Sequence, residues 1–205
     1  MADKEEVEVK FYVQDLGVLE SRLKRMGATL LQPRIFEMNL RFDTPAGDLA
    51  RRKQVLRLRQ DTQARLTFKG AAQDRLDVAA RQEIEFVVSD FGAARRFLEA
   101  LGYQVVLIYE KFRAVFGFGD GIEVTLDEMP FSNFVEIEGP DAESIQKIAS
   151  RLGLDWETRV IDSYMGLFEK LKGREKLEMR DLTFANFRNL NVGPEQLGVR
   201  QADQA

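Results

Sequence analysis

Charged side chains occupy every second position in seven separate segments of this 205-residue chain, and apolar side chains fill most positions between them. A period of two places alternate residues on opposite faces, which is the geometry of a β-strand. The stretch at 36–42 and the turn signal at 119–121 extend the pattern, so we expect about eight strands, mostly antiparallel. The alternating charged positions are Glu6, Glu8 and Lys10; Arg57 and Arg59; Arg65 and Lys69; Arg81, Glu83 and Glu85; Lys111 and Arg113; Glu123 and Asp127; and Glu136 and Glu138.

A strand-and-helix unit recurs along the chain. Residues 9–17 align with residues 84–92 at an offset of 75, and a weaker third copy begins at residue 135. In each copy an alternating segment is followed by Asp, by about three turns of helical periodicity and by Gly, which are the signals of an N-cap, a helix and a C-cap. Each helical stretch carries one apolar face, so we expect amphipathic helices that cover the sheet.

The charged face of the sheet limits what the protein can do. The helices need an apolar partner, so they cover the apolar face and leave the charged face uncovered. If the sheet closes, that face becomes a lumen, and the fold is α+β: an eight-stranded antiparallel closed β-barrel, or tunnel, with helices packed outside. A lumen with charges of both signs is unfavourable unless they pair with each other or with a ligand. Arg and Lys clamp polyanions, and divalent cations bridge them to carboxylates, so a triphosphate suits this lumen.

The chain contains no cysteine and no histidine. Disulfides, thiolate zinc sites, histidine ligands and a Ser-His-Asp triad are therefore excluded. Any metal must be held by oxygen ligands, which favours Mg²⁺ or Mn²⁺. Any general base must be a carboxylate, a lysine, a tyrosine or water.

Charge and hydropathy also bear on partners and location. The formal net charge of −4 argues against a broad nucleic-acid surface. Residues 1–6 contain no apolar stretch, and no segment is long and apolar enough to cross a bilayer. We therefore expect a cytoplasmic protein, monomeric or homodimeric, that binds neither nucleic acid nor membrane.

An ordered series of motifs resembles the CYTH family, which includes class IV adenylyl cyclases, thiamine triphosphatases and inorganic triphosphatases. The segment Glu6-Val7-Glu8-Val9-Lys10 matches the family's E-x-E-x-K signature. Later landmarks follow in order at 56–59 (LRLR), 67–70 (TFKG), 83–85 (EIE), 110–113 (EKFR), 126–127 (LD) and 135–138 (VEIE). The resemblance covers about residues 5–172 and implies an eight-stranded antiparallel tunnel.

The resemblance also implies a role for each charged position. Carboxylates at i and i+2 on one strand face the same side, which agrees with a shared cation. The implied ligands of a divalent metal are Glu6, Glu8, Glu136 and Glu138. The implied phosphate clamps are Lys10, Arg57, Arg59, Lys69, Lys111 and Arg113. The implied supporting acids are Glu83, Glu85 and Asp127. The residues expected to be catalytic are Glu6, Glu8, Lys10 and Glu136. Arg65 and Glu123 also point inward by parity, where a structural ion pair is an equally good interpretation.

Two reactions suit this lumen, and the leading hypothesis is the cyclase, with the triphosphatase as the alternative. The overall layout resembles the class IV cyclase branch, which favours conversion of ATP to cyclic AMP and pyrophosphate. The paired acids Glu136 and Glu138 are typical of the family's triphosphatases, which favours hydrolysis of inorganic, nucleoside or thiamine triphosphate. A third hypothesis is a non-catalytic module that binds polyphosphate or a nucleotide. Such a module would keep its affinity without Glu6 and Glu8.

The strand pattern and the resemblance both end near Gly173. We therefore expect a tunnel domain at 1–172 and a C-terminal tail at 173–205 that is helical or partly disordered. On this interpretation, deletion of 174–205 leaves the fold nearly unchanged. We also expect Phe11, Phe68, Phe86, Phe112 and Phe116 in the core. We expect Tyr164 to pack rather than to act in catalysis.

Overall fold

The computed structural model describes residues 5–71, 73–74, 79–119 and 121–203; the side chains of residues 5–6, 73–74 and 79–81 lie outside this description. Within these residues, nine strands form one sheet. They are β1 (Glu5–Val13), β2 (Thr29–Asp43), β3 (Val55–Gln60), β4 (Ala64–Lys69), β5 (Gln73–Asp74), β6 (Ala79–Val88), β7 (Gln104–Gly117), β8 (Glu123–Met129) and β9 (Ser132–Gly139).

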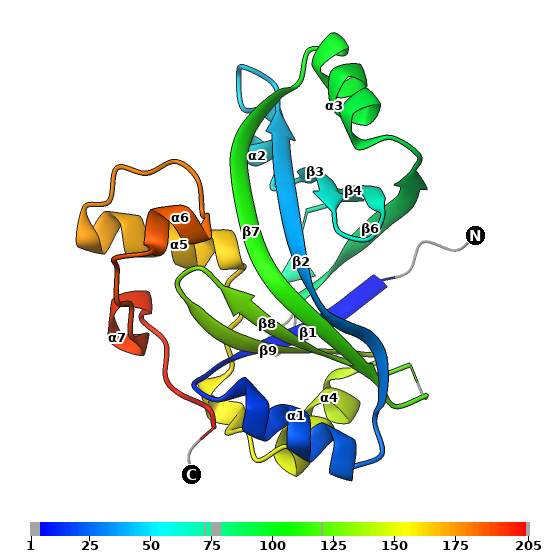
Figure 1. The fold of residues 1–205 in the computed structure, drawn as a ribbon, viewed down its shortest axis with the longest axis vertical. Coiled ribbons are helices and arrows are strands. Elements are labelled where there is room, and N and C mark those ends of the chain that lie inside the picture. The colour runs from blue at the N-terminus through cyan, green and yellow to red at the C-terminus, as the bar shows by residue number, and fades with distance from the viewer. Residues whose placement is uncertain (1–4, 72, 75–78, 120, 204–205) are drawn as a thin grey trace.

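All the strand pairs are antiparallel, and their order is β1-β9-β8-β7-β2-β3-β4-β6-β5. The two longest strands, β2 and β7, curve alongside each other through the whole molecule (Figure 1). β6 also pairs with β1, from Glu5↔Gln82 to Glu8↔Ala79. The predicted α+β fold with eight main antiparallel strands is confirmed, and β5 is a two-residue addition to it. Full closure of the sheet into a tunnel stays a prediction.

The helices gather in three places around the sheet (Figure 1). α1 and α4 lie together at one end, α3 lies at the other, and α5 to α7 lie along one side. The helices are α1 (Leu16–Arg25), α2 (Asp48–Arg51), α3 (Phe91–Ala100), α4 (Ala142–Arg151), the 3-10 helix η1 (Trp156–Thr158), α5 (Tyr164–Glu175), α6 (Phe184–Phe187) and α7 (Pro194–Leu197).

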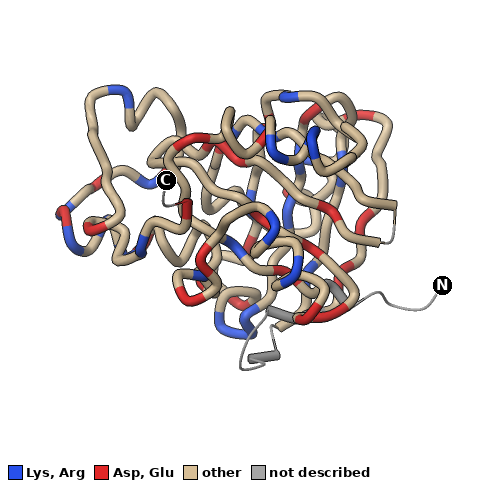
Figure 2. Tube along the Cα trace, turned by 90° about the horizontal axis from the view of Figure 1, so that it is seen from below, with Lys and Arg blue, Asp and Glu red and all other residues tan. Residues whose placement is uncertain are grey.

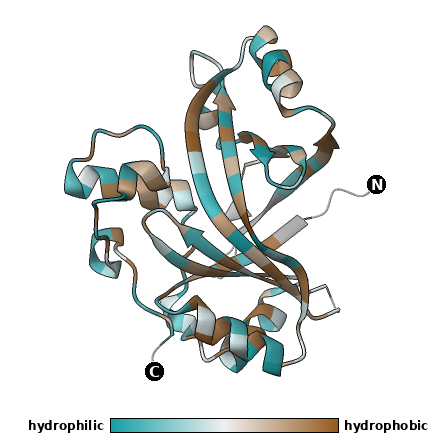
Figure 3. Cartoon of the chain, in the orientation of Figure 1, coloured by the Kyte–Doolittle hydropathy of each residue, from teal (hydrophilic) through white to brown (hydrophobic). Residues whose placement is uncertain are grey.

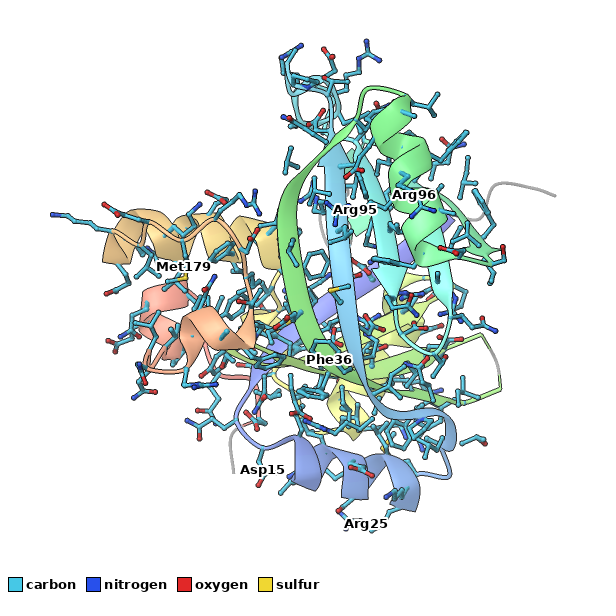
Figure 4. The ribbon with its side chains drawn as sticks, turned by 45° about the horizontal axis from the view of Figure 1, so that its top comes forward. Asp15, Arg25, Phe36, Arg95, Arg96 and Met179 are labelled. Atoms are coloured by element: carbon cyan, nitrogen blue, oxygen red, sulfur yellow. The ribbon has the colours of Figure 1, made fainter. Side chains whose placement is uncertain are left out.

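The three predicted strand-and-helix units are confirmed, with their caps. Asp15, Asp90 and Asp141 each accept a hydrogen bond from the backbone N–H three residues on, at 3.1, 2.7 and 2.7 Å. Figure 4 shows Asp15 and Arg25 at the two ends of α1. A glycine with positive φ follows each helix, where a side chain would be strained. These glycines are Gly27, Gly102 and Gly153.

Helix packing divides the core into three clusters. α1 and α4 cover the apolar side of β1, β8 and β9 around the fully buried Phe11, Phe116 and Ile137. α3 covers β2 and β3 around Leu58 and Leu98. The third cluster joins α5, α6 and α7 to the ends of β1, β8 and β9. Figure 3 shows hydrophilic and hydrophobic residues alternating along β2 and β7, as the period of two requires.

The prediction for Phe86 is wrong, whereas those for Phe11 and Phe116 are confirmed. Phe86 is 53% exposed, and its neighbour Ile84 on the same face of β6 is 46% exposed. The reason is local. α3 packs mainly on β3 and β4, and its cluster includes Val88 at the end of β6, so the apolar face around Phe86 stays partly uncovered.

The predicted C-terminal segment at 173–205 contains the short helices α6 and α7, and its described residues up to 203 pack against the sheet. Leu182, Phe187 and Leu197 are buried at 0%, 4% and 1% exposure. Leu182 exchanges backbone hydrogen bonds with β7, and Ala202 donates to the carbonyl of Tyr12 on β1. The segment therefore adds apolar surface and backbone pairing to the sheet. The exact boundary at 172/173 stays a prediction. Among the described helices, none has the length and apolarity that a membrane span requires.

Candidate active site

The charged faces of the strands line a cavity of about 850 Å³. Figure 2 shows basic and acidic positions interspersed along the chain. The predicted site residues that line the cavity are Glu8, Lys10, Arg57, Arg59, Lys69, Glu83, Glu85, Lys111, Arg113, Glu136 and Glu138. Asp127 is fully buried directly behind this lining. Arg65 and Glu123 line the cavity too. Glu6 lies on β1, but its side chain falls outside the described part of the chain.

Strand register brings the acidic residues of the first and last long strands together. β1 and β9 are antiparallel neighbours, with Glu8 opposite Glu138 and Lys10 opposite Glu136. Directly opposed residues on one face lie within contact distance of each other. The alternation that the sequence shows therefore becomes a mixed cluster of acids and one lysine.

Lys10 stands at the centre of this cluster. Its ammonium lies 2.6 Å from Glu8 Oε1 and 2.8 Å from Glu136 Oε1. Although burial opposes the charged form, Glu136 and Glu8 raise the pKa of Lys10, so it stays protonated. Burial and the adjacent Glu136 raise the pKa of Glu8. Burial acts in the same sense on Glu136, but Lys10 and Arg113 overcome it and hold the pKa of Glu136 well below its ordinary value.

Asp127 anchors the next part of the network. Arg113 donates to both of its oxygens, with Nε at 2.7 Å and Nη2 at 2.5 Å, and Nη2 also reaches Glu136 Oε2 at 2.7 Å. Lys111 Nζ lies 3.2 Å from the same carboxylate. The hydroxyl of Tyr164, from the first turn of α5, donates to Asp127 Oδ2 at 2.8 Å. Asp127 thus contacts two of the predicted phosphate clamps, Arg113 and Lys111, and its supporting role stays a prediction.

Tyr164 lies closer to the site chemistry than its predicted packing role suggests. Its ring centroid is 5.5 Å from Lys10 Nζ and 5.6 Å from Lys111 Nζ, and the residue lines the cavity. Burial and Asp127 raise the pKa of Tyr164 well above its ordinary value, so the phenol stays neutral. Sequence reasoning had no signal for these contacts, because α5 follows the last strand and its docking is a tertiary event.

A second network surrounds Glu85 on β6. Arg59 Nη2 lies 3.1 Å from Glu85 Oε1, Arg57 Nη2 lies 3.4 Å from Oε2, and the hydroxyl of Thr67 donates to Oε2 at 2.8 Å. Arg57 also donates to Tyr109 Oη at 3.3 Å. One strand away, Lys69 and Glu83 form an ion pair at 2.8 Å. The predicted clamps on β3 and β4 are therefore held by the predicted supporting acids of β6.

The inward-facing residues of β2 were missed by the sequence analysis. Glu37 and Asn39 on β2 are fully buried and face the same side as Arg41, which lines the cavity with Glu37. The signal was present, because the stretch at 36–42 alternates as the other strands do. It was weaker, since one of its three inward positions is uncharged.

The acidic residues fit a divalent cation by ligand type. Glu8 and Glu136 lie within hydrogen-bonding reach of each other, and their repulsion is one cause of the raised pKa of Glu8. Two carboxylates held this close are satisfied by a proton or by a cation, and carboxylate oxygens are the ligands that Mg²⁺ and Mn²⁺ prefer. In the described residues, however, no cluster of three or more acids has the geometry of a metal site. Lys10 instead lies between the two carboxylates.

Comparisons with known proteins assign the family. The family model of the CYTH domain matches residues 4–161, most of the chain, so this chain belongs to the CYTH family. No curated protein sequence matches the chain.

Solved structures share the fold. A candidate adenylate cyclase of Vibrio parahaemolyticus superposes with a TM-score of 0.73 at 23% identity, over 82% of this chain and 99% of that one. A protein of Pyrococcus horikoshii OT3 gives a TM-score of 0.67 at 26% identity, over 80% and 98%. A candidate adenylyl cyclase of Hippeastrum with a dominant triphosphatase activity gives 0.60 at 19% identity, over 80% and 95%.

Proposed function

We propose that this chain is a divalent-metal-dependent enzyme that acts on a triphosphate bound in the charged cavity. The observation that carries the proposal is the cavity lining, in which cations and carboxylates from eight strands face a single space of about 850 Å³. Such a lining is electrostatically unfavourable without an anionic ligand and its cations. The pairing of β1 with β6 supports closure of the eight long strands into a tunnel around that ligand.

The proposed roles follow from charge and position. Arg residues bind phosphate oxygens in bidentate fashion, and Lys residues act as point charges. The proposed clamp comprises Lys10, Arg57, Arg59, Lys69, Lys111 and Arg113. The proposed ligands of Mg²⁺ or Mn²⁺ are Glu6, Glu8, Glu136 and Glu138. Such a metal, when bound, neutralises phosphate charge and polarises the phosphoryl oxygens.

Without substrate, the cations of the cavity pair with acids, and a bound triphosphate can replace these acids. Lys10, Arg59 and Arg113 each bridge two or more acids. Phosphate oxygens offer the same charge-assisted acceptors, so a triphosphate can take over these cations without leaving them unpaired. The carboxylates released from Lys10 are then available to a divalent cation.

Hydrolysis is the reaction that this lining supports best. A cyclase must also hold a ribose and a base so that the 3′-hydroxyl faces the α-phosphorus, which calls for a contiguous apolar or aromatic surface. The hydroxyls of the two lining tyrosines, Tyr109 and Tyr164, are engaged with Arg57 and Asp127. The non-aromatic apolar side chains of the lining each come from a different element. They are Leu31, Ala50, Val55, Val115 and Met165. The triphosphatase activity of the Hippeastrum relative agrees with this choice. Cyclisation of ATP stays the second candidate, because of the relative from Vibrio parahaemolyticus.

Product analysis tests the proposal. The protein is incubated with tripolyphosphate, ATP or thiamine triphosphate in Mg²⁺ or Mn²⁺, with excess EDTA as the control. We expect phosphate and pyrophosphate from tripolyphosphate, and no product in EDTA. Cyclic AMP and pyrophosphate from ATP would favour the second candidate. Tight binding without any product would identify a binding module and contradict both reactions.

A further inference from the structure

Glu37, at the middle of β2, is fully buried, and neither of its carboxylate oxygens has a hydrogen-bond partner. In the part of the chain that the structure describes, no other buried carboxylate oxygen lacks one. A buried carboxylate without a hydrogen bond is uncommon in a folded protein, and a ligand or a catalytic role is one explanation for it. Glu37 also lines the cavity.

Four cations face Glu37 from the strands on either side. Arg59 Nη1 and Lys111 Nζ each approach it to 3.7 Å, beyond hydrogen-bond distance. Burial favours the neutral acid, but the four cations outweigh it and lower the pKa of Glu37. Tyr109 on β7 is the further titratable group that faces it. The four cations are Arg57 and Arg59 on β3, and Lys111 and Arg113 on β7.

Other acids of the cavity are already engaged. Asp127 accepts from Arg113, Lys111 and Tyr164. Glu85 accepts from two arginines and a threonine, and Glu136 pairs with Lys10 and Arg113. A carboxylate saturated with donors has no lone pair free for a proton in the right geometry. Because the chain has no histidine, a side chain that acts as the base must be a carboxylate, a lysine or a tyrosine.

We propose that Glu37 is the general base that accepts a proton from the attacking nucleophile, which in hydrolysis is water. The inference rests on the proposed function. The water oxygen forms the new bond to the terminal phosphorus, while one water proton passes to the Glu37 carboxylate. The bond from the terminal phosphorus to the bridging oxygen breaks, and the electron pair leaves with pyrophosphate, whose charge the arginines and lysines hold.

Substrate binding itself activates this base. Phosphate oxygens neutralise the cations that lower the pKa of Glu37, so its basicity rises only when a triphosphate is present. Arg59 and Lys111 are drawn to the phosphate, which opens the carboxylate towards the nucleophile. Asn39 lies two residues along β2, on the same face, and both of its side-chain polar atoms are also buried without a partner. We assign it to orienting the same water.

Glu37→Gln tests the inference, because it keeps the volume of the side chain and removes the base. With tripolyphosphate and Mn²⁺, we expect kcat to fall about a hundredfold or more. KM should stay unchanged or fall, since one negative charge beside the phosphates is gone. The acidic limb of the pH profile of kcat, which reports protonation of the base, should disappear. Glu128→Gln is the matched control, since Glu128 pairs with Arg34 outside the cavity and should keep parental kinetics.

The possible outcomes distinguish failure of the general base from failure of the proposed function. An active parent together with a Glu37→Gln variant within threefold of its kcat would overturn the base and leave the proposed function standing. A loss expressed only as a higher KM, with the acidic limb intact, would also overturn the base and make Glu37 a structural counter-ion. A parent that neither binds nor turns over any triphosphate would remove the proposed function, and the base with it.

Discussion

Individual side chains in the cavity are held by opposite charges that the proposed ligand can replace. Arg57 contacts Glu85, Thr67 and Tyr109, and Arg59 lies within 3.7 Å of three acids. These arginines are 13% and 12% exposed, so their charges are poorly screened. A phosphate that displaces the acids therefore gains strong, directional contacts.

Replacing either arginine should weaken triphosphate binding. We expect Arg57→Ala or Arg59→Ala to lower the affinity for tripolyphosphate by about 1.5–3 kcal/mol, roughly tenfold to hundredfold, because each removes a charge-assisted hydrogen bond. Isothermal titration calorimetry measures the change. Arg95→Ala is the matched control, because Arg95 is exposed on α3 and pairs with Glu99. Parental affinity in both cavity variants would contradict the clamp.

Tyr164 offers a test at a single atom. Tyr164→Phe removes the donor to Asp127 but keeps the ring beside both lysines, so we expect it to lower the free energy of unfolding by about 1 kcal/mol. Tyr164→Ala also leaves a void and should lower it by about 3–5 kcal/mol. Denaturant unfolding of both variants measures the difference. Equal stability of the Phe variant and the parent would mean that the hydroxyl adds nothing.

Among the elements, the turn from β2 into α2 depends on a single carboxylate. Asp43 accepts backbone N–H groups of Thr44, Leu49 and Ala50 at 2.7–2.9 Å. Burial opposes the ionised form, but these bonds prevail and lower the pKa of Asp43 from its ordinary value of 3.8. The carboxylate thereby holds α2 in place beside the cavity, which Ala50 and Val55 help to line.

The stabilising effect of Asp43 should depend on pH. Asp43→Ala should lower the free energy of unfolding by about 2 kcal/mol at neutral pH, since it unpairs buried donors. A lowered native pKa means that this contribution is complete above the ordinary pKa of 3.8 and is lost as the pH falls through the native value. Unfolding curves of parent and variant between pH 7 and pH 2.5 should therefore converge on acidification. A constant difference would assign the effect to packing.

The whole molecule is a sheet with a charged side and three helical coverings, the last of which comes from the end of the chain. That covering contains four buried side chains beyond α5, at Leu182, Phe187, Leu197 and Ala202. It also includes the carboxylate of Asp203, which accepts the backbone N–H groups of Gln14 and Asp15. The C-terminal segment thus packs on the end of β1 that leads into α1.

Truncation after residue 175 should destabilise the protein, contrary to the expectation from sequence. The loss of this apolar burial should lower the free energy of unfolding by several kcal/mol, or the melting temperature by about 10 °C or more. Differential scanning calorimetry measures it. Leu182→Ala should reproduce part of the loss, and Leu190→Ala, at a position 40% exposed, should have little effect. An unchanged melting temperature on truncation would instead support the expectation that the fold does not need residues 174–205.

Divalent cations should stabilise the folded state. Mg²⁺ or Mn²⁺ relieves the repulsion between Glu8 and Glu136, so we expect a higher melting temperature with metal than in EDTA, and a larger rise with tripolyphosphate. Glu8→Gln should abolish the rise and stay folded, because Glu136 still pairs with Lys10. Glu99→Gln, on the outer surface of α3, is the control. Equal melting temperatures in metal and EDTA would contradict the metal site.

Local sequence patterns predict which residues share a face and where each strand-and-helix unit begins and ends. A period of two needs no tertiary information, so the eight strands and most of the cavity lining could be predicted. The aspartate caps at Asp15 and Asp90 are equally local, because the capping carboxylate and the N–H group that it binds are three residues apart.

Which elements pack against each face depends on how the strands and helices dock in three dimensions. Phe86 has the pattern of a core residue but is 53% exposed, because the alternating pattern alone does not reveal which part of a face a helix covers. The tail lacks periodicity because its buried residues pack singly from short turns against strands that are distant in the chain. The lack of hydrogen bonds at the Glu37 carboxylate depends on distances between elements, as does the contact of Tyr164 with Asp127. Such distances are set when the elements dock together, so local patterns do not encode them.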